Sequence, residues 1–297
     1  PAAVRAPAPG APRPPRQQAR GQRAGRLAVE NPQVLDAAPH GLSIDPPPGR
    51  CQNDLMTLEV RLFPCLNDNY GFLVRDVATG AVATVDTPDA TAILAELERS
   101  GWGRLDLILN THWHPDHTQG NAALKEATGC EIVGPEEVRR AAPLDRVVAG
   151  GDTVALGETV FEISDTPGHT LGHIVYRSVA DRLAFVGDVL FTLGCGRLFE
   201  GTPHQMWTSL QTLAAWPDET VIWCAHEYTA SNARFALSLD DRPEMQARAA
   251  EIFAARERGE PTVPTTIGSE KAFNPFLRAP DAADFAVRRA GKDSFSG

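Results

Sequence analysis

No hydrophobic run in this sequence is long enough to cross a membrane, since none of its 297 residues lies in a stretch approaching ~18 consecutive apolar residues. A charged start followed by an apolar segment is also missing, so no secretory signal is expected. Lysine is scarce, with three residues, and 38 acidic residues outnumber 28 basic ones, for a net charge of −10. The lack of a basic excess argues against a general nucleic-acid binder.

Paired cysteines are missing as well. The five cysteines are odd in number, widely spaced and form no CxxC motif, which argues against a disulfide framework and predicts a reduced, cytoplasmic protein. They are Cys51, Cys65, Cys130, Cys195 and Cys224. A hydrophobic content of 42% excludes a collagen-like or wholly disordered chain, and the length suits one large or two smaller domains.

The first 50 residues differ in composition from the rest. They hold 11 of the 24 prolines and show no apolar period of 2 or 3.6, so they cannot bury enough surface to offset the entropy of ordering. Residues 1–55 are therefore predicted to be a disordered Pro/Arg-rich extension. An organellar transit peptide would share the arginines, but Ser43 is the only serine here and the prolines interrupt any amphipathic helix.

Strand patterns begin at residue 57. Segments 57–64, 69–76 and 81–87 alternate or run apolar, as antiparallel strands do. Asp89 is placed to cap a helix, and 105–110 is a continuous apolar run, typical of a strand buried on both faces.

The second half of the sequence shows similar strand patterns, and its final part has helical patterns. A helix is expected from about Pro203 to Trp216, followed by a strand at 220–225. After Tyr228 the patterns are helical to the end. We therefore predict a larger domain of strands and helices over 56–226 and a small helical C-terminal domain over 227–297.

The segment THWHPDHTQGN (111–121) concentrates the chemistry and directly follows the buried strand. His112 and His114 are two residues apart, so on extended backbone their side chains point the same way. Asp116 and His117 follow Pro115, where the chain must turn. A solvated polar loop is the alternative, but three histidines and an aspartate within six residues favour a metal site.

Four ligands this close are too crowded to surround one ion, so two ions are the simpler solution. His112 and His114 then belong to one ion, and Asp116 and His117 to the other. Further candidates are His169 after a Pro-Gly turn, Asp188 at a strand end and His226 just past a strand. Taken singly, these three could be a helix cap or surface groups. We expect His173 to be a packed group, and His40 and His204 to be incidental.

The spacing HxHxDH, then a lone histidine, a strand-end aspartate and a final histidine resembles the metallo-β-lactamase superfamily. Four later segments resemble the glyoxalase II family, the hydroxyacylglutathione hydrolases, within it. They are GDVLFTLGCGRLFEGT (187–202), CAHEYTASNARFA (224–236), PTTIGSEKAFNPFLR (264–278) and RAGKDSF (289–295). This resemblance runs from about residue 57 to the end and implies an α+β fold, a four-layer αββα sandwich with a small helical, glutathione-binding C-terminal domain.

The resemblance also implies a ligand set for two divalent metal ions. His112, His114 and His169 would hold one ion, Asp116, His117 and His226 the other, and Asp188 would bridge them. Two carboxylates and a hydroxide nearly neutralise two divalent ions, so burial of this cluster is tolerable. Zinc is the favoured metal, and iron or manganese would also be compatible.

The implied reaction is hydrolysis of a thioester, typically S-D-lactoylglutathione, to D-lactate and glutathione in methylglyoxal detoxification. Asp116 and Asp188 are the candidate catalytic residues, and water activated at the metal pair would attack the carbonyl. The leaving thiolate needs no dedicated proton donor, because its parent thiol has a pKa of roughly 8.5. We expect a monomer that acts on a small glutathione thioester and binds neither nucleic acid nor membrane.

Glutathione carries two carboxylates, so its site needs cations. The resemblance places them at Arg197, Arg289 and Lys292, with Tyr228 bonding the peptide and Phe199 standing where some relatives carry tyrosine. A solvated helix end is the alternative for the terminal pair. Other functions also stay open: a glutathione persulfide dioxygenase using one iron, another hydrolase of this fold, or a non-catalytic, metal-stabilised binding module.

Overall fold

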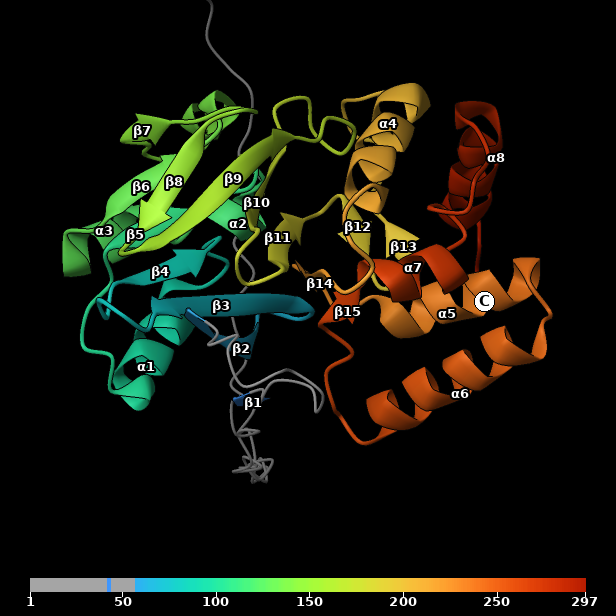
Figure 1. The fold of residues 1–297 in the computed structure, drawn as a ribbon, viewed down its shortest axis with the longest axis horizontal. Helices are drawn as coiled ribbons and strands as arrows, with labels where there is room; N and C mark the ends of the chain where they lie inside the picture. The colour runs from blue at the N-terminus through green and yellow to red at the C-terminus, as the bar shows by residue number, and fades with distance from the viewer. Residues whose placement is uncertain (1–41, 44–56) are drawn as a thin grey trace, which may run out of the picture. The chain divides into compact units, whose positions relative to one another are not determined.

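A computed structural model describes residues 42–43 and 57–297 (Figure 1). Its first sheet has seven strands in the order β1-β2-β3-β4-β5-β6-β7. These are Leu42–Ser43 (β1), Leu58–Cys65 (β2), Asn69–Asp76 (β3), Val82–Val85 (β4), Leu107–Leu109 (β5), Glu131–Gly134 (β6) and Arg146–Val147 (β7). The backbone of β1 pairs antiparallel with β2. The prediction for the rest of 1–55 lies outside the described residues.

Both faces of the first sheet are buried, as the apolar run at 105–110 predicts. Leu107 and Leu109 of β5 join the core between the sheets, whereas Ile108 between them joins the core under the helices. The helices on that side are α1 (Ala90–Ser100) and α3 (Asn121–Thr128). Asp89 caps α1 as predicted, because its side chain accepts hydrogen bonds from the first-turn amides.

The second sheet has six strands in the order β15-β14-β11-β10-β9-β8. They are Thr153–Leu156 (β8), Thr159–Asp165 (β9), Ile174–Ser178 (β10), Leu183–Gly187 (β11), Val221–Cys224 (β14) and Thr265–Thr266 (β15). A separate hairpin joins β12 (Leu190–Phe191) to β13 (Gly194–Cys195). Helix α4 (Pro203–Ala214) starts with a capping box at Thr202 and Gln205 and places its buried face in the same core as this sheet.

Aromatic side chains fill the space between the two sheets. Phe72 of β3 lies edge-on to Phe185 of β11, with 5.5 Å between ring centroids, and also edge-on to Trp223 of β14. Full burial of each such side chain contributes roughly 1.5–3 kcal/mol. With helices outside, the two packed sheets confirm the predicted four-layer αββα sandwich.

The C-terminal segment is mainly helical, as predicted. Its helices are α5 (Thr229–Leu239), α6 (Pro243–Glu257), α7 (Ile267–Phe273) and α8 (Ala282–Asp293). It differs from the prediction in contributing β15, which pairs antiparallel with β14 of the sandwich. Two threonines carry no apolar period, so this edge strand leaves no signal in the sequence. Phe276 and Phe285 belong to the same hydrophobic core as the sheets.

Two short helices complete the described secondary structure: α2 (Pro115–Thr118) and the 3₁₀ helix η1 (Glu136–Arg140). Across residues 57–297, no helix combines the length and apolar content needed to span a bilayer. Strands β4 and β5 run parallel, as do β11 and β14. The carboxyl ends of each pair therefore meet at one edge, which is where the chain places its candidate ligands.

Candidate metal centre

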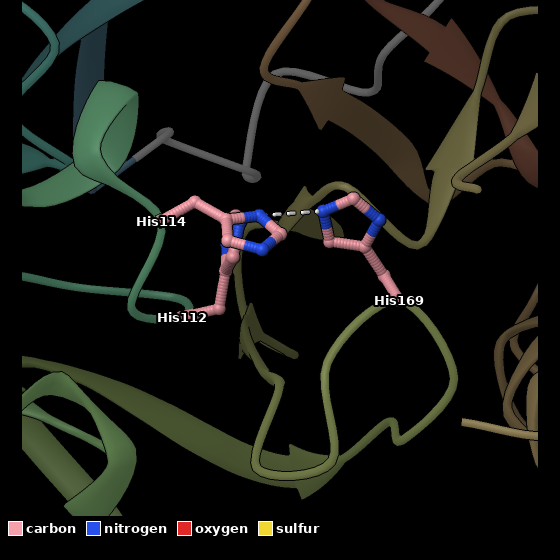
Figure 2. Close-up of side chains that lie close together, drawn as sticks. All are labelled: His112, His114 and His169. Carbon is pink, nitrogen blue, oxygen red and sulfur yellow. Dashed lines mark hydrogen bonds between the residues drawn. The ribbon is translucent and has the colours of Figure 1, made fainter. Parts of the chain in front are cut away.

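The first ligand group brings together His112, His114 and His169 (Figure 2). His112 and His114 come from the loop after β5, whereas His169 comes from the loop between β9 and β10. The Nδ1 atom of His114 lies 3.0 Å from Nε2 of His112 and 3.0 Å from Nε2 of His169. Three imidazole nitrogens therefore converge on one point, as in a metal site with histidine ligands.

A second group consists of Asp116, His117 and His226. The Nε2 atoms of the two histidines are 3.3 Å apart, and each lies 3.4 Å from Oδ2 of Asp116. His226 follows β14, more than 100 positions from the other two, so this group exists only in the folded chain.

Asp188 lies between the two groups. Its Oδ2 is 3.3 Å from Nε2 of His169, and its Oδ1 is 3.5 Å from Nε2 of His117 and 3.4 Å from Nε2 of His226. Oδ1 is buried and accepts no hydrogen bond from any described residue. A buried carboxylate oxygen in that state is costly unless a cation compensates it. Five imidazoles and two carboxylates in this arrangement fit divalent metal ions.

The outward-facing nitrogens of four of these histidines are engaged. Such partners orient a metal-binding ring and raise its basicity. They are the Thr111 hydroxyl at 3.0 Å from Nδ1 of His112, Asp86 at 2.8 Å from His117, the Arg197 carbonyl at 2.8 Å from His169 and Asp68 at 2.9 Å from His226. In each ring Nε2 is then left to face the centre.

Asp86 is the main supporting residue that the sequence did not reveal. It follows β4, is buried, and accepts hydrogen bonds from the Thr111 amide and hydroxyl as well as its contact with His117. Its φ of 56° is in the left-handed region, which aspartate tolerates better than most residues. The available signal was an aspartate at the end of an apolar strand, in the segment AVATVDT.

Two further histidines in the described residues, His173 and His204, lie as the sequence predicts. His173 is fully buried, stacks on His112 with 4.9 Å between ring centroids, and accepts the Asp188 backbone N–H through Nε2 at 3.1 Å. It therefore supports Asp188 through the backbone. His204 is exposed on α4, and His40 lies outside the described residues.

Burial and mutual charge set the protonation of the centre. Burial and the neighbouring imidazoles hold the pKa of His112 well below its usual value, so its ring is neutral, the form in which histidine can bind a metal. Burial opposes charge on His117 and Asp188 too, but nearby opposite charges dominate. Asp188 and then Asp86 act on His117, whereas His226 and then His117 act on Asp188. The pKa of His117 is raised well above its usual value, and that of Asp188 is lowered well below it. A divalent cation would take the place of this proton.

Two aromatic side chains flank the ligand groups. Phe199, with 63% of its surface exposed, lies edge-on to His114 and His169 at centroid distances of 5.5 and 5.2 Å. Tyr228 is partly exposed and stacks on His226 at 4.7 Å. The predicted substrate residues Phe199 and Tyr228 therefore border the first and second groups, respectively.

Two of the predicted substrate-binding cations, Arg289 and Lys292, are on α8, and Arg197 lies near its end. Arg289 is not exposed as a substrate-binding residue would be. Its guanidinium is buried and donates to the Cys195 carbonyl and to Asp293, at 2.8 Å each. Two of its nitrogens are thus used within the protein, and Nε is buried without a partner among the described residues. Such burial does not suit a ligand for a substrate carboxylate. Lys292 is half-buried and donates to Ser231 of α5, and the Arg197 side chain is largely exposed.

Comparison with known proteins adds independent evidence. Residues 82–226 match the family model of the metallo-beta-lactamase superfamily, and 227–295 match that of the hydroxyacylglutathione hydrolase C-terminus. The chain is 54% identical over 254 residues to the hydroxyacylglutathione hydrolase of Maricaulis maris (strain MCS10), covering 80% of this chain and 99% of that relative. It is 50% identical over 253 residues to the hydroxyacylglutathione hydrolase of Erythrobacter litoralis (strain HTCC2594), covering 80% and 100%.

A solved structure is also similar. The crystal structure of ETHE1 from Myxococcus xanthus matches with a TM-score of 0.62 and 25% sequence identity. The match covers 80% of this chain and 92% of that chain.

Proposed function

This chain belongs to the hydroxyacylglutathione hydrolase family of the metallo-β-lactamase superfamily, and on that premise we propose that it hydrolyses S-D-lactoylglutathione to D-lactate and glutathione. The observation that carries this proposal is Asp188, whose two oxygens face two complete ligand groups. A centre of this kind suits hydrolysis of an activated carbonyl, and residues 227–295 match the C-terminal family model of the hydroxyacylglutathione hydrolases.

The proposed cofactor is a pair of divalent ions, with zinc favoured by the histidine-rich donors and iron or manganese also compatible. His112, His114 and His169 would hold one ion, the Asp116, His117 and His226 group the other, and Asp188 both. Such ions, when bound, supply a nucleophile from water near neutral pH and stabilise charge on the carbonyl oxygen.

The protein's own groups orient the reactants around this centre. Asp116 is proposed to position the attacking water. Despite partial burial, His117 and then the Asn69 amide, at 3.1 Å from Oδ2, hold the pKa of Asp116 below its usual value. Burial and the nearby carboxylates raise the pKa of Tyr228, so its hydroxyl stays protonated and can donate a hydrogen bond to the peptide of the substrate.

Lys292 and Arg197 are proposed to bind the glutathione carboxylates, because the Arg197 side chain is largely exposed and the half-buried Lys292 ammonium keeps one N–H beyond its two bonds to Ser231. All seven candidate ligands come from one chain, which suits a monomer. The described cysteines are all free and buried, which suits the reducing cytoplasm.

A glutathione persulfide dioxygenase with one iron is less well supported. That activity requires a single ion, whereas Asp116, His117 and His226 form a complete second group. The match of 227–295 to the hydroxyacylglutathione hydrolase C-terminus points the same way.

The direct test is to incubate the purified protein with S-D-lactoylglutathione, follow release of the free thiol, and measure the metal content of the same sample. We expect thiol release with about two ions per chain. Oxygen consumption with glutathione persulfide, without thioester cleavage, would instead establish the dioxygenase.

Lys292→Ala and Arg289→Ala should have different effects. Loss of the Lys292 ammonium should raise KM about tenfold with kcat changed less, because one charge-assisted hydrogen bond contributes roughly 1.5–3 kcal/mol before solvent screening. Arg289→Ala should instead lower the melting temperature, since it leaves the buried Cys195 carbonyl without its partner. Steady-state kinetics and thermal unfolding of both variants check this.

A small 2-hydroxyacyl thioester without the peptide serves as the control substrate. Lys292→Ala should leave its turnover nearly unchanged, because that substrate has no glutathione carboxylate to bind. Equal losses for both substrates would show structural damage and would contradict the role given to Lys292.

The pH dependence of KM follows from the environment of Lys292. Burial, together with the cations of Arg289, Arg197 and Arg234, lowers its pKa to about 8, although Asp293 opposes this. Below that pH the ammonium is charged and binds a carboxylate, whereas above it the charge is lost. KM should therefore rise as the pH passes about 8 and approach the KM of Lys292→Ala, whose own KM should lack this rise.

A further inference from the structure

His114 is supported differently from the other four histidines of the centre. Both hydrogen-bond-range contacts of its imidazole ring use Nδ1 and reach His112 and His169. Over residues 57–297, no side chain or carbonyl bonds its outer nitrogen Nε2. The ring is also only partly buried. Its orientation must therefore come from packing and not from a hydrogen bond.

Trp113 supplies part of that packing. Its ring lies edge-on to His114 with 4.9 Å between centroids, and Phe199 packs on the same imidazole. Trp113 is itself held in place, because its Nε1–H donates to Oε1 of Glu200 at 3.0 Å. The Arg140 guanidinium lies over the indole ring at 4.8 Å.

Glu200 connects this tryptophan to the loop that carries His169. Its Oε1 also accepts from Arg140 at 2.8 Å, and its Oε2 accepts from the Leu171 amide at 3.1 Å. Its own amide donates to the His169 carbonyl at 3.3 Å. One carboxylate thus joins the segments bearing His114 and His169, which contribute ligands to the same group.

We propose that Glu200 is a positioning residue that sets the orientation of His114 through Trp113 and thereby tunes metal affinity at the first group. The proposal rests on the proposed dinuclear centre. Glu200 contacts neither the ligand atoms nor the second group, so its effect should be selective. A partner that orients a ligand typically changes metal affinity 10- to 100-fold when removed.

The test measures zinc affinity of metal-free protein in competition with a chromophoric chelator, without any activity assay. Glu200→Gln replaces one accepting carboxylate oxygen with an N–H donor, so at least one of the bonds from Trp113, Arg140 and Leu171 is lost. It should weaken one of the two binding steps about tenfold or more and leave the other unchanged. His114→Ala identifies which step belongs to the first group.

Trp113→Phe keeps an aromatic ring beside His114 but removes the indole N–H. It should reproduce the loss, and the double variant with Glu200→Gln should lose little more, because both changes break one connection. Trp113→Phe also keeps the proposal testable if Glu200→Gln does not fold.

Glu137→Gln is the matched control. Glu137 accepts from the Thr170 hydroxyl at 2.6 Å and the Gly172 amide at 2.7 Å, in the same loop, but does not contact Trp113. Glu137→Gln should therefore keep a zinc affinity at the first group that is closer to that of wild type. Equal loss in Glu137→Gln, additive losses in the double variant, or unchanged affinity in Glu200→Gln would overturn the proposal. A wild-type protein that binds fewer than two ions would instead contradict the proposed function.

Discussion

Asp188→Ala should reduce metal content and lower kcat by two orders of magnitude or more. The variant removes the carboxylate whose oxygens lie 3.3 Å from Nε2 of His169 and 3.4 Å from Nε2 of His226. Without that shared anion, two divalent cations would repel each other across a cluster with one remaining carboxylate, that of Asp116. Metal analysis and single-turnover kinetics on the same preparation measure both effects.

Asp188→Asn is the shape-matched comparison, because it keeps the volume and the backbone bond to His173 but loses the charge. We expect it to fold as wild type does and still to lose most of the activity. Two ions per chain with near-normal turnover in either variant would contradict the bridging assignment.

Asp86→Ala should have the second-largest effect, although Asp86 is not a proposed ligand of the metal pair. The change frees His117 from its 2.8 Å contact and leaves the Thr111 amide and hydroxyl without an acceptor. Each unsatisfied buried group costs about 1–3 kcal/mol, and alanine is poorly suited to the φ of 56°. We expect a lower melting temperature and a 10- to 100-fold loss in metal affinity or kcat.

Asp68→Ala tests whether the burial of Asp86 is the reason for the large effect expected of Asp86→Ala. Asp68 makes the equivalent contact with His226 at 2.9 Å, but its side chain is 43% exposed, so water can replace it. The loss should therefore be much smaller than in Asp86→Ala. Similar effects of the two variants on melting temperature and metal affinity would show that the buried network around Asp86 has no special importance.

The ligand candidates were recognisable from the sequence because they are local or stand at strand ends. His112, His114, Asp116 and His117 fall within six residues after a strand that the apolar run at 105–110 predicts. Parallel strands end at the same edge, so a polar residue just after such a strand is a reasonable candidate. Asp188 and His226 follow β11 and β14, which are parallel neighbours.

The supporting residues were not recognisable in the same way. Asp86 and His117 are 31 positions apart, and Glu200 is 87 positions from Trp113. Nothing in the spacing of these residues indicates that they meet, because their contact depends on how separate loops approach one another. Arg289 shows the opposite case: a family pattern suggested a substrate ligand, and packing of α8 on the β13 carbonyl buried it.

The sequence alone therefore predicted sheets covered by helices, a strand at 105–110 buried on both faces and the candidate ligand types, whereas the four-layer sandwich followed from the family resemblance. The structure then placed Leu107 and Leu109 in one core and Ile108 in the other. Only the tertiary structure decided which candidate ligands converge and which polar side chains already have hydrogen-bond partners within the protein. Periodicity and strand-end position are properties of a local segment. Hydrogen-bond partners, burial and the pKa shifts of His117, Asp188 and Lys292 arise from atoms that the fold brings together from distant segments.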